Sequence, residues 1–297
     1  MPDIQALCEK HNIAVQAGLP MSRMTSFRIG GLAEWLVFPQ TAGELQALLR
    51  FCAEGHQKPL VFGNGSNLLV KDSGIDGVVI STERLTGIKI LPEHRVYCEA
   101  GRKLSDLCLF AQENGLAGLE FAYGIPGTAG GAAFMNAGAY GGEMKDVLHG
   151  VSYLTGEGEI RALSASELKL GYRRSVFMEN GGTVLGLTLQ LRPGGPEEIL
   201  ADMREILRRR KDKQPLEYPS AGSVFRRPEG HFASELIERC GLKGRQVGGA
   251  QVSEKHAGFI INRGGARAAD VRALIALVQT VVESRTGILL EPEIRFV

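Results

Sequence analysis

Apolar residues recur at helical spacing in several parts of the chain. Residues 41–55 begin with Thr41 and Glu44 in capping-box spacing, and the apolar residues that follow fall on one helical face. The same spacing predicts four further helices: one from Leu104 that stops at Asn114–Gly115, one with an apolar face from Ile199 to Leu207, one ending at Cys240–Gly241, and a long one over about residues 270–285.

Short apolar runs bounded by turn residues predict strands between these helices. Residues 59–70 form an apolar run, a Gly/Asn/Ser turn and a second apolar run, and residues 151–163 predict a hairpin around Gly156 and Gly158. Further strands are predicted at residues 96–100, 183–191, 257–262 and 288–297. Mixed helices and strands without an internal repeat predict an α+β fold and argue against solenoids and propellers.

A linker divides this pattern into a larger and a smaller part. Residues 192–198 read RPGGPEE, and Pro196 suits the first turn of the helix that follows. We therefore expect a domain boundary here, with a smaller α+β unit after it.

Composition narrows the class of protein. The 297 residues suit two or three small domains, and 34 basic against 33 acidic residues give a net charge of +1. This balance argues against a protein that coats nucleic acid or an anionic membrane. The five cysteines form an odd set without a CxxC pair, which favours reduced thiols. We see neither a signal peptide nor an apolar stretch near the ~18 residues of a membrane span, so a cytoplasmic protein is expected.

Glycine is the outlier in composition and marks the strongest candidate site. It supplies 39 of 297 residues, about twice its usual share of roughly 7%. Seven glycines fall within residues 124–142, which speaks against a regular helix or strand there. Backbone amides in such a loop can form a concave site for phosphates, so a pyrophosphate-bearing ligand is predicted. The alternative is that these glycines serve turns and close packing.

A second loop, residues 63–67, directly follows a predicted strand. Its small side chains and backbone donors could hold the same pyrophosphate, although Asn64–Gly65 between apolar runs is also a common hairpin signal. The chain has no Walker sequence and no strand-to-helix GxGxxG with a following acidic residue. Neither a P-loop NTPase nor a Rossmann dehydrogenase is therefore supported.

Seven ordered sequence blocks carry a resemblance to a known family. They are TSFRIGG (25–31), VFGNGSNLLV (61–70), GIPGTAGGAAFMNAGAYGGEM (124–144), GYRRSVF (171–177), PSAGSVFRRP (219–228), KHAGFIIN (255–262) and LEPEIRF (290–296). In this order they resemble the UDP-N-acetylenolpyruvoylglucosamine reductases, and only about the first 20 residues go unmatched. The short spacing between Arg173 and the linker is similar to the shorter subtype, which lacks a tyrosine-bearing insertion.

The resemblance implies a fold, a reaction and a location. It implies a vanillyl-alcohol-oxidase-type FAD-binding domain of two α+β subdomains and a C-terminal α+β substrate domain. The expected segments are an N-terminal helical extension (1–20), FAD subdomains at 21–85 and 86–193, and a substrate domain at 197–297. The implied reaction uses NADPH and FAD to reduce UDP-N-acetylglucosamine enolpyruvate to UDP-N-acetylmuramate in cytoplasmic peptidoglycan synthesis. We expect a monomer whose partners are small molecules.

The resemblance also implies three catalytic residues. Arg173 would hold the substrate carboxylate and stabilise negative charge, Ser223 would donate a proton to C2, and Glu293 would donate a hydrogen bond to the enol. From the residues alone, Arg173 could be a surface arginine, with Arg174 as a competing register, and Ser223 a turn serine. Glu293 could equally pair with Arg295 on a strand.

Binding residues follow from the two loops and the basic region. The loops are assigned to FAD, through Gly63, Asn64, Gly65, Ser66, Asn67, Gly124, Pro126, Gly127, Thr128, Gly130, Gly131, Asn136 and Gly138. Eight basic and three acidic residues between Arg204 and Arg227 would attract the UDP diphosphate, although a solvated helix face is the alternative. The substrate candidates are Tyr140, Tyr172, Lys213 and Lys255.

Three further expectations complete the prediction. None of the six histidines falls in metal-ligand spacing, so no metal site is expected. A flavoprotein oxidase of the same fold is a rival function, since fold alone does not fix chemistry. A catalytically silent nucleotide-sugar-binding protein is the other rival.

Overall fold

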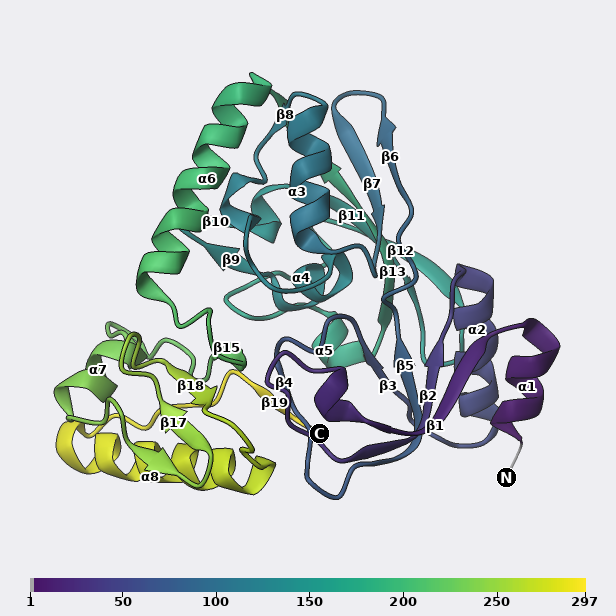
Figure 1. The fold of residues 1–297 in the computed structure, drawn as a ribbon. Coiled ribbons are helices and arrows are strands. Elements are labelled where there is room, and N and C mark those ends of the chain that lie inside the picture. The colour runs from purple at the N-terminus through teal and green to yellow at the C-terminus, as the bar shows by residue number, and fades with distance from the viewer. Residues whose placement is uncertain (1–2) are drawn as a thin grey trace. The chain divides into compact units, whose positions relative to one another are not determined.

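The computed structural model describes residues 3–297, and the chain forms two compact units. Of these described residues, the first unit comprises 3–17, 35–64 and 77–208, and the second comprises 18–34, 65–76 and 209–297. Helices and strands are mixed in both, which confirms the α+β prediction (Figure 1). The predicted N-terminal helical extension (1–20) is helical only over Ile4–His11, because Ala14–Pro20 form a strand, while the four domain boundaries stay a proposal.

Most residues of a four-stranded sheet, together with two helices, belong to the N-terminal part of the first unit. Its strands, in spatial order, are β1 (Ala14–Pro20), β2 (Leu32–Phe38), β5 (Ile75–Ser81) and β3 (Leu60–Phe62). Helices α1 (Ile4–His11) and α2 (Ala42–Glu54) bury apolar residues in one core with these strands. The predicted cap of α2 is confirmed, since Thr41 Oγ1 accepts a hydrogen bond from the Glu44 amide at 3.2 Å. Local sequence therefore fixes the start of this helix.

A five-stranded antiparallel sheet forms the rest of the first unit's core. Its strands, in spatial order, are β12 (Ile160–Ser164), β11 (Leu148–Leu154), β13 (Thr183–Gln190), β7 (Arg95–Glu99) and β6 (Ile88–Leu91). Helices α3 (Leu104–Glu113) and α4 (Ala129–Met135) lie beside this sheet (Figure 1) and bury apolar residues in the same core. The predicted hairpin at residues 151–163 is confirmed by the pairing of β11 with β12.

Shorter elements complete the first unit. They are β8 (Leu116–Ala117), β9 (Gly138–Ala139), β10 (Gly142–Glu143), β14 (Arg192–Pro193), α5 (Phe177–Asn180) and the 3₁₀ turns Glu120–Ala122 and Met144–Asp146. Helix α6 (Pro196–Lys213) begins with the predicted proline and runs on into the second unit's residues.

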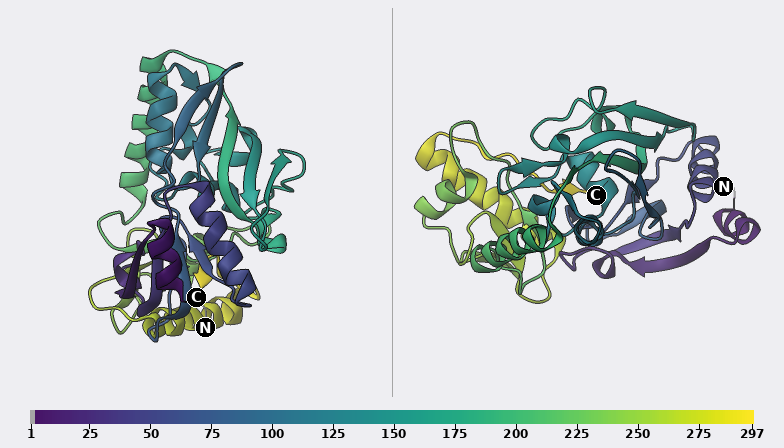
Figure 2. Two further views of the ribbon diagram at one scale, coloured as in Figure 1. Left: turned by 90° about the vertical axis from the view of Figure 1, so that its right-hand side faces the viewer. Right: turned by 90° about the horizontal axis from the view of Figure 1, so that it is seen from above.

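The second unit has an antiparallel sheet with two helices. Its strands, in spatial order, are β15 (Ser220–Ser223), β18 (Phe259–Asn262), β17 (Ala250–Val252) and β16 (Gln246–Val247). Helices α7 (Ala233–Arg239) and α8 (Ala268–Thr286) share its core, and both views of Figure 2 include α8 as the long yellow helix. The 3₁₀ turn Met21–Arg23 and the parallel pair β4 (Leu68–Leu69) and β19 (Arg295–Phe296) also belong here.

Three sequence expectations need correction. Residues 288–297 were expected to form one strand, but only Arg295–Phe296 do, since Pro292 has no N–H for a ladder. The stretch 124–142 contains the helix α4, in which a Cβ at Gly130 would lie 2.6 Å from the Ala100 Cβ. The hairpin alternative for Asn64–Gly65 is wrong, because β3 pairs with β5 and β4 pairs with β19.

All five cysteines are buried and free of disulfides. Burial raises the pKa of Cys98 to about 12 and that of Cys8 and Cys52 to about 11. We therefore expect a disulfide-exchange thiol reagent at neutral pH to label no thiol rapidly in the folded protein and five after unfolding. Rapid labelling of any cysteine in the native protein would contradict this burial.

Among residues 3–297, no helix is long and apolar enough to cross a membrane.

Candidate active site

The first part of one predicted cofactor loop lies against the glycine-rich segment within the first unit. A Cβ at Gly63 would overlap the Thr128 hydroxyl, so glycine permits the close approach. That hydroxyl accepts a hydrogen bond from the Gly131 amide at 3.3 Å and caps α4. A cavity of about 170 Å³ opens here, lined by Asn64, Glu83, Thr86, Gly101, Arg102, Lys103, Asp106 and Thr128.

The remainder of that loop, residues 65–67, belongs to the second unit. Gly65 has φ +58°, and a Cβ there would overlap the Met24 carbonyl oxygen, so the position requires glycine. The side-chain amide of Asn67 donates to the Glu293 carbonyl at 3.3 Å, and the Arg295 amide donates to the Asn67 carbonyl at 2.9 Å. Asn67 thus holds the segment that carries Glu293.

Ser223 and Glu293 come together within the second unit. Ser223 ends β15 and pairs with Phe259 of β18. The next residue, Val224, accepts a hydrogen bond at its carbonyl from the Glu293 amide at 2.6 Å. Both Ser223 and Glu293 are half-buried residues. This backbone hydrogen bond therefore brings the segment of Ser223, the predicted proton donor, next to the segment of Glu293, the predicted hydrogen-bond donor.

Glu291 differs from Glu293 in its surroundings. Its side chain is 71% exposed and lies 3.8 Å from the Arg226 guanidinium, while the Glu291 carbonyl accepts from the Arg226 amide at 2.9 Å. Glu291 is thus a surface carboxylate beside an arginine, and an exposed pair of this kind contributes little to stability.

A tight turn presents Arg173 in the first unit. Gly171 and Arg174 exchange two backbone hydrogen bonds of 3.1 Å across Tyr172 and Arg173. Arg173 has φ +52°, a left-handed conformation that costs free energy for a residue with a side chain. Its guanidinium carbon lies 5.4 Å from the Tyr172 ring centroid. The neighbouring Arg174 instead pairs with Glu179 at 2.5 Å and is 65% exposed.

His256, in the predicted KHAGFIIN block, supports the strand beside Ser223. Burial lowers its pKa, and its Nδ1 accepts the Gly258 N–H at 3.2 Å. The Gly258 carbonyl in turn accepts from the Val224 amide at 2.9 Å.

Comparison with known proteins identifies the family. The model of the FAD binding domain matches residues 33–164, and that of the UDP-N-acetylenolpyruvoylglucosamine reductase C-terminal domain matches residues 214–297. The chain is 46% identical over 289 residues to the UDP-N-acetylenolpyruvoylglucosamine reductase of Lactobacillus helveticus, covering 97% of both chains. It belongs to the UDP-N-acetylenolpyruvoylglucosamine reductase family. The resemblance of the seven blocks is thus confirmed.

Other members of this family agree. The chain is 48% identical over 279 residues to the reductase of Syntrophomonas wolfei, covering 94% of this chain and 93% of that one. The crystal structure of the Thermus caldophilus reductase matches with a TM-score of 0.82 and 36% identity, over 96% of this chain and 99% of that chain. A more distant likeness to Physcomitrella patens BBE-like 1, at 16% identity and TM-score 0.51, covers 64% of this chain and 44% of that one and shows the fold alone. The chain is an FAD-dependent oxidoreductase.

The first unit's cavity fits the chemistry of FAD. Asn64 and Thr128 offer an amide and a hydroxyl from both predicted loops, and Arg102 and Lys103 add two cations. A cavity of about 170 Å³ exceeds what one water needs, so it has room for a polar group such as a diphosphate. Asn64, Thr128 and the two cations could therefore hold the diphosphate of FAD.

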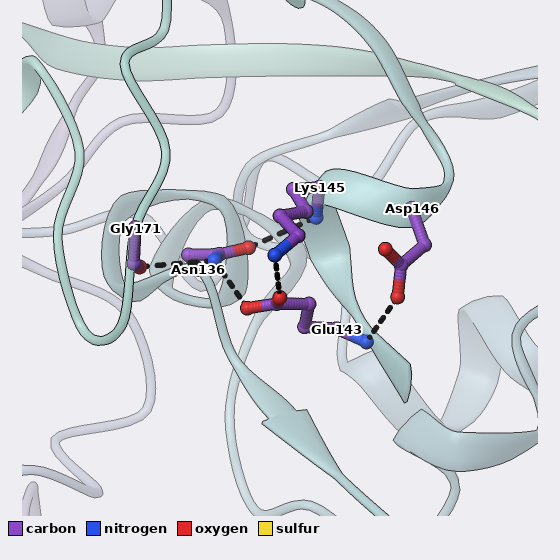
Figure 3. Close-up of polar contacts among 5 residues, drawn as sticks. All are labelled: Asn136, Glu143, Lys145, Asp146 and Gly171. Atoms are coloured by element: carbon purple, nitrogen blue, oxygen red, sulfur yellow. Dashed lines mark hydrogen bonds and ion pairs between the residues drawn. The ribbon is translucent and has the colours of Figure 1, made fainter. Parts of the chain in front are cut away.

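Asn136, predicted to bind the cofactor, makes three side-chain hydrogen bonds within the protein. Its amide nitrogen donates to Glu143 at 2.6 Å and to the Gly171 carbonyl at 3.0 Å, and its amide oxygen accepts from the Lys145 amide at 2.9 Å (Figure 3). Glu143 also pairs with the Lys145 ammonium. Asn136 is 1% exposed, so it ties the glycine-rich segment to the turn that carries Arg173.

We expect Asn136→Ala to lower the free energy of unfolding by about 3 kcal/mol, because three partly buried hydrogen bonds are lost and alanine disfavours φ +43°. Denaturant unfolding of the FAD-free protein measures it. As a control, Asn114→Ala removes an exposed hydrogen bond to the Phe110 carbonyl and should cost about 1 kcal/mol or less. Equal losses of unfolding free energy in the two variants would show that the Asn136 hydrogen bonds stabilise the fold no more than one exposed hydrogen bond does.

The remaining predicted residues of the reductase site are less enclosed. Tyr140 is 39% and Tyr172 52% exposed, Pro126 and Lys213 are exposed, and Gly138 pairs with Glu143 in a short strand. The Lys255 ammonium donates to the Lys211 carbonyl at 2.5 Å and lies 3.9 Å from Glu217, so it closes the end of α6. Ser66 and Gly127 are half-buried, and Gly124 has φ +82°.

Sequence reasoning missed part of the cavity. Glu83, Thr86, Gly101, Arg102, Lys103 and Asp106 line it, although none was a candidate. The available signal was Gly101 followed by two basic residues directly after a predicted strand, a short pattern with little specificity.

Proposed function

We propose that this chain reduces the enolpyruvyl group of UDP-N-acetylglucosamine enolpyruvate with NADPH, giving UDP-N-acetylmuramate for peptidoglycan synthesis. The observation that carries the proposal is the pairing of the segments of Ser223 and Glu293 in a chain 46% identical to a named reductase. In this reaction NADPH becomes NADP⁺, C3 gains a hydrogen with two electrons, C2 gains a proton, and the C=C bond becomes single.

The cofactor supplies one part of this chemistry. When bound, FAD supplies the two-electron redox chemistry that links NADPH to the enolpyruvyl group. We assign its binding to Gly63–Asn67 and to the glycine-rich segment from Gly124 to Gly138, with Asn136 as a positioning residue rather than a contact.

The protein's own side chains handle charge and protons. Arg173 binds the substrate carboxylate and stabilises the negative charge that spreads onto it as C3 is reduced. Glu293, in its carboxylic acid form, donates a hydrogen bond to the same enolate. The Ser223 hydroxyl then donates the proton to C2. Because a serine hydroxyl is a weak acid, this step requires the strongly basic carbon that the enolate provides.

The substrate and the setting are also part of the proposal. Tyr140, Tyr172, Lys213 and Lys255 are assigned to the UDP-sugar, with Lys255 acting mainly by holding the end of α6. We further propose a monomer acting in the cytoplasm.

The test follows NADPH absorbance with FAD-loaded protein, with and without the enolpyruvyl sugar, in air and without oxygen. The proposal predicts NADPH oxidation that requires the sugar and persists without oxygen. Oxidation that requires oxygen would favour a flavoprotein oxidase of this fold, and bound FAD with no turnover would favour a silent nucleotide-sugar-binding protein.

A further inference from the structure

The Arg102 guanidinium has unused hydrogen-bonding capacity in a buried place. One terminal nitrogen, Nη1, donates to the Thr86 carbonyl at 3.3 Å. Its Nε is buried and has no hydrogen-bond partner among residues 3–297. Buried donors without partners are rare in native proteins, because each loses its hydrogen bond to water without replacement. The unsatisfied nitrogen therefore calls for a group that the protein itself does not supply.

The backbone holds Arg102 in a fixed place beside the glycine-rich segment. Its carbonyl accepts from the Ala129 amide at 2.8 Å, and the Leu104 amide donates to the Gly127 carbonyl at 2.9 Å. On the other side, the Gly101 amide donates to the Leu85 carbonyl at 2.8 Å. A Cβ at Gly101 would overlap the Thr82 carbonyl oxygen, so this close approach depends on glycine. Arg102 is thus pre-positioned rather than carried on a loose loop.

The cavity that Arg102 lines carries two cationic and two anionic side chains. Arg102 and Lys103 are cations and Glu83 and Asp106 are carboxylates, yet none of the four forms an ion pair within residues 3–297. A ligand that suits this lining has anionic oxygens for the cations and hydroxyl donors for the carboxylates. A nucleotide diphosphate with its ribose has both.

Two of the cavity's other residues connect it to the cofactor. Asn64 and Thr128 come from the two loops assigned to FAD, and both face the same cavity as Arg102. We propose that Arg102 binds the diphosphate of FAD, with Lys103 adding a second positive charge. This inference rests on the proposed function, since it deepens the account of the same cofactor site. A guanidinium is suited to the task because its planar donors match phosphate oxygens.

The test measures FAD binding to the FAD-free protein at low and high salt, using Arg102→Met, Arg102→Lys and the matched control Arg84→Met. Arg84 is exposed, stacks on Phe38 at 5.1 Å and does not line the cavity. We expect Arg102→Met to raise the Kd for FAD about tenfold to a hundredfold at low salt, because the variant loses a charge-assisted hydrogen bond to the cofactor. High salt should reduce the difference in Kd between Arg102→Met and the wild type, because salt screens the charge of the guanidinium. Arg102→Lys should fall between, and Arg84→Met should match the wild type.

A second readout separates binding from a structural role. Thermal unfolding of the FAD-free protein should occur at the same or a higher temperature in Arg102→Met, because the variant removes an unsatisfied buried donor. The inference is overturned if Arg102→Met binds FAD within twofold of Arg84→Met, or if its lost affinity is matched by lost stability of the FAD-free protein. Wild-type protein without affinity for FAD would overturn the proposed function as well.

Discussion

Replacing Ser223 with alanine should slow product formation by about 10²- to 10⁴-fold, the usual contribution of a positioned proton donor. Reduction of bound FAD by NADPH should proceed at the wild-type rate, because that half of the reaction needs no proton at C2. Rapid mixing of the FAD-loaded variant, first with NADPH and then with the enolpyruvyl sugar, measures the two halves separately. The fold should survive the change, since Ser223 is half-buried at the end of a strand.

The control for this variant is Ser220→Ala in the same short strand. The Ser220 carbonyl accepts a hydrogen bond from the Ser26 hydroxyl at 2.7 Å, and that backbone contact survives the loss of the Ser220 side chain. Ser220→Ala should therefore turn over at close to the wild-type rate. If both serine variants keep wild-type rates in both half-reactions, Ser223 is not the proton donor.

Replacing Arg173 with methionine should lower kcat/KM by about 10²- to 10³-fold, as expected when a charged group that stabilises an oxyanion is removed. Most of the loss should fall on kcat, because the charge on the substrate carboxylate grows as C3 is reduced. Steady-state kinetics at several concentrations of the enolpyruvyl sugar separates kcat from KM. The left-handed φ of +52° at this position makes the conformation costly for any residue with a side chain, so the variant retains the same turn strain.

Arg174→Met is the matched control for Arg173. The Arg174 guanidinium contacts Glu179 in two ways, at 3.2 and 2.5 Å, and both groups are largely exposed. Loss of this surface pair should change the free energy of unfolding by no more than about 1 kcal/mol and leave kcat nearly unchanged. The reverse ranking, with Arg174→Met inactive and Arg173→Met active, would move the role to the neighbouring residue.

Local features of this fold could be predicted because their causes lie close together in the sequence. The cap of α2 joins Thr41 to the nearby Glu44, and the hairpin of β11 with β12 pairs two strands on either side of one short loop. The glycine-rich segment was recognised by composition alone. Its helix α4 was not, because Gly130 serves the close approach of Ala100, which lies 30 residues earlier.

Features set by distant partners could not be predicted in the same way. The turn at Asn64–Gly65 has the pattern of a hairpin, but its flanking strands pair with β5 and with the C-terminal β19. The expected final strand is interrupted at Pro292, and Glu293 is held instead by Val224. Pattern alone gives a strand its period but not its partner.

Some residues of the candidate site could be predicted from the sequence, and others could not. Family resemblance selected Glu293 over Glu291, and the structure gives the two carboxylates different surroundings, with Glu291 exposed beside Arg226. The cavity around Arg102 could not be found from sequence, because it joins residues 64, 83–86, 101–106 and 128 through folding alone. Asn136 is assigned to the cofactor by family resemblance, and the structure adds three hydrogen bonds that its side chain makes within the protein.

The most direct test of this account is a single turnover without oxygen in D₂O. FAD-loaded protein is reduced with one equivalent of NADPH, mixed with UDP-N-acetylglucosamine enolpyruvate, and followed by flavin absorbance and by mass spectrometry of the sugar. The account predicts reoxidation of the flavin by the sugar, with a lactyl ether product that carries solvent-derived deuterium at C2 and also at C3, because the N–H hydrogens of the reduced flavin exchange with D₂O before the sugar is added. A flavin that stays reduced until oxygen is admitted, with the enolpyruvyl sugar recovered unchanged, would contradict it.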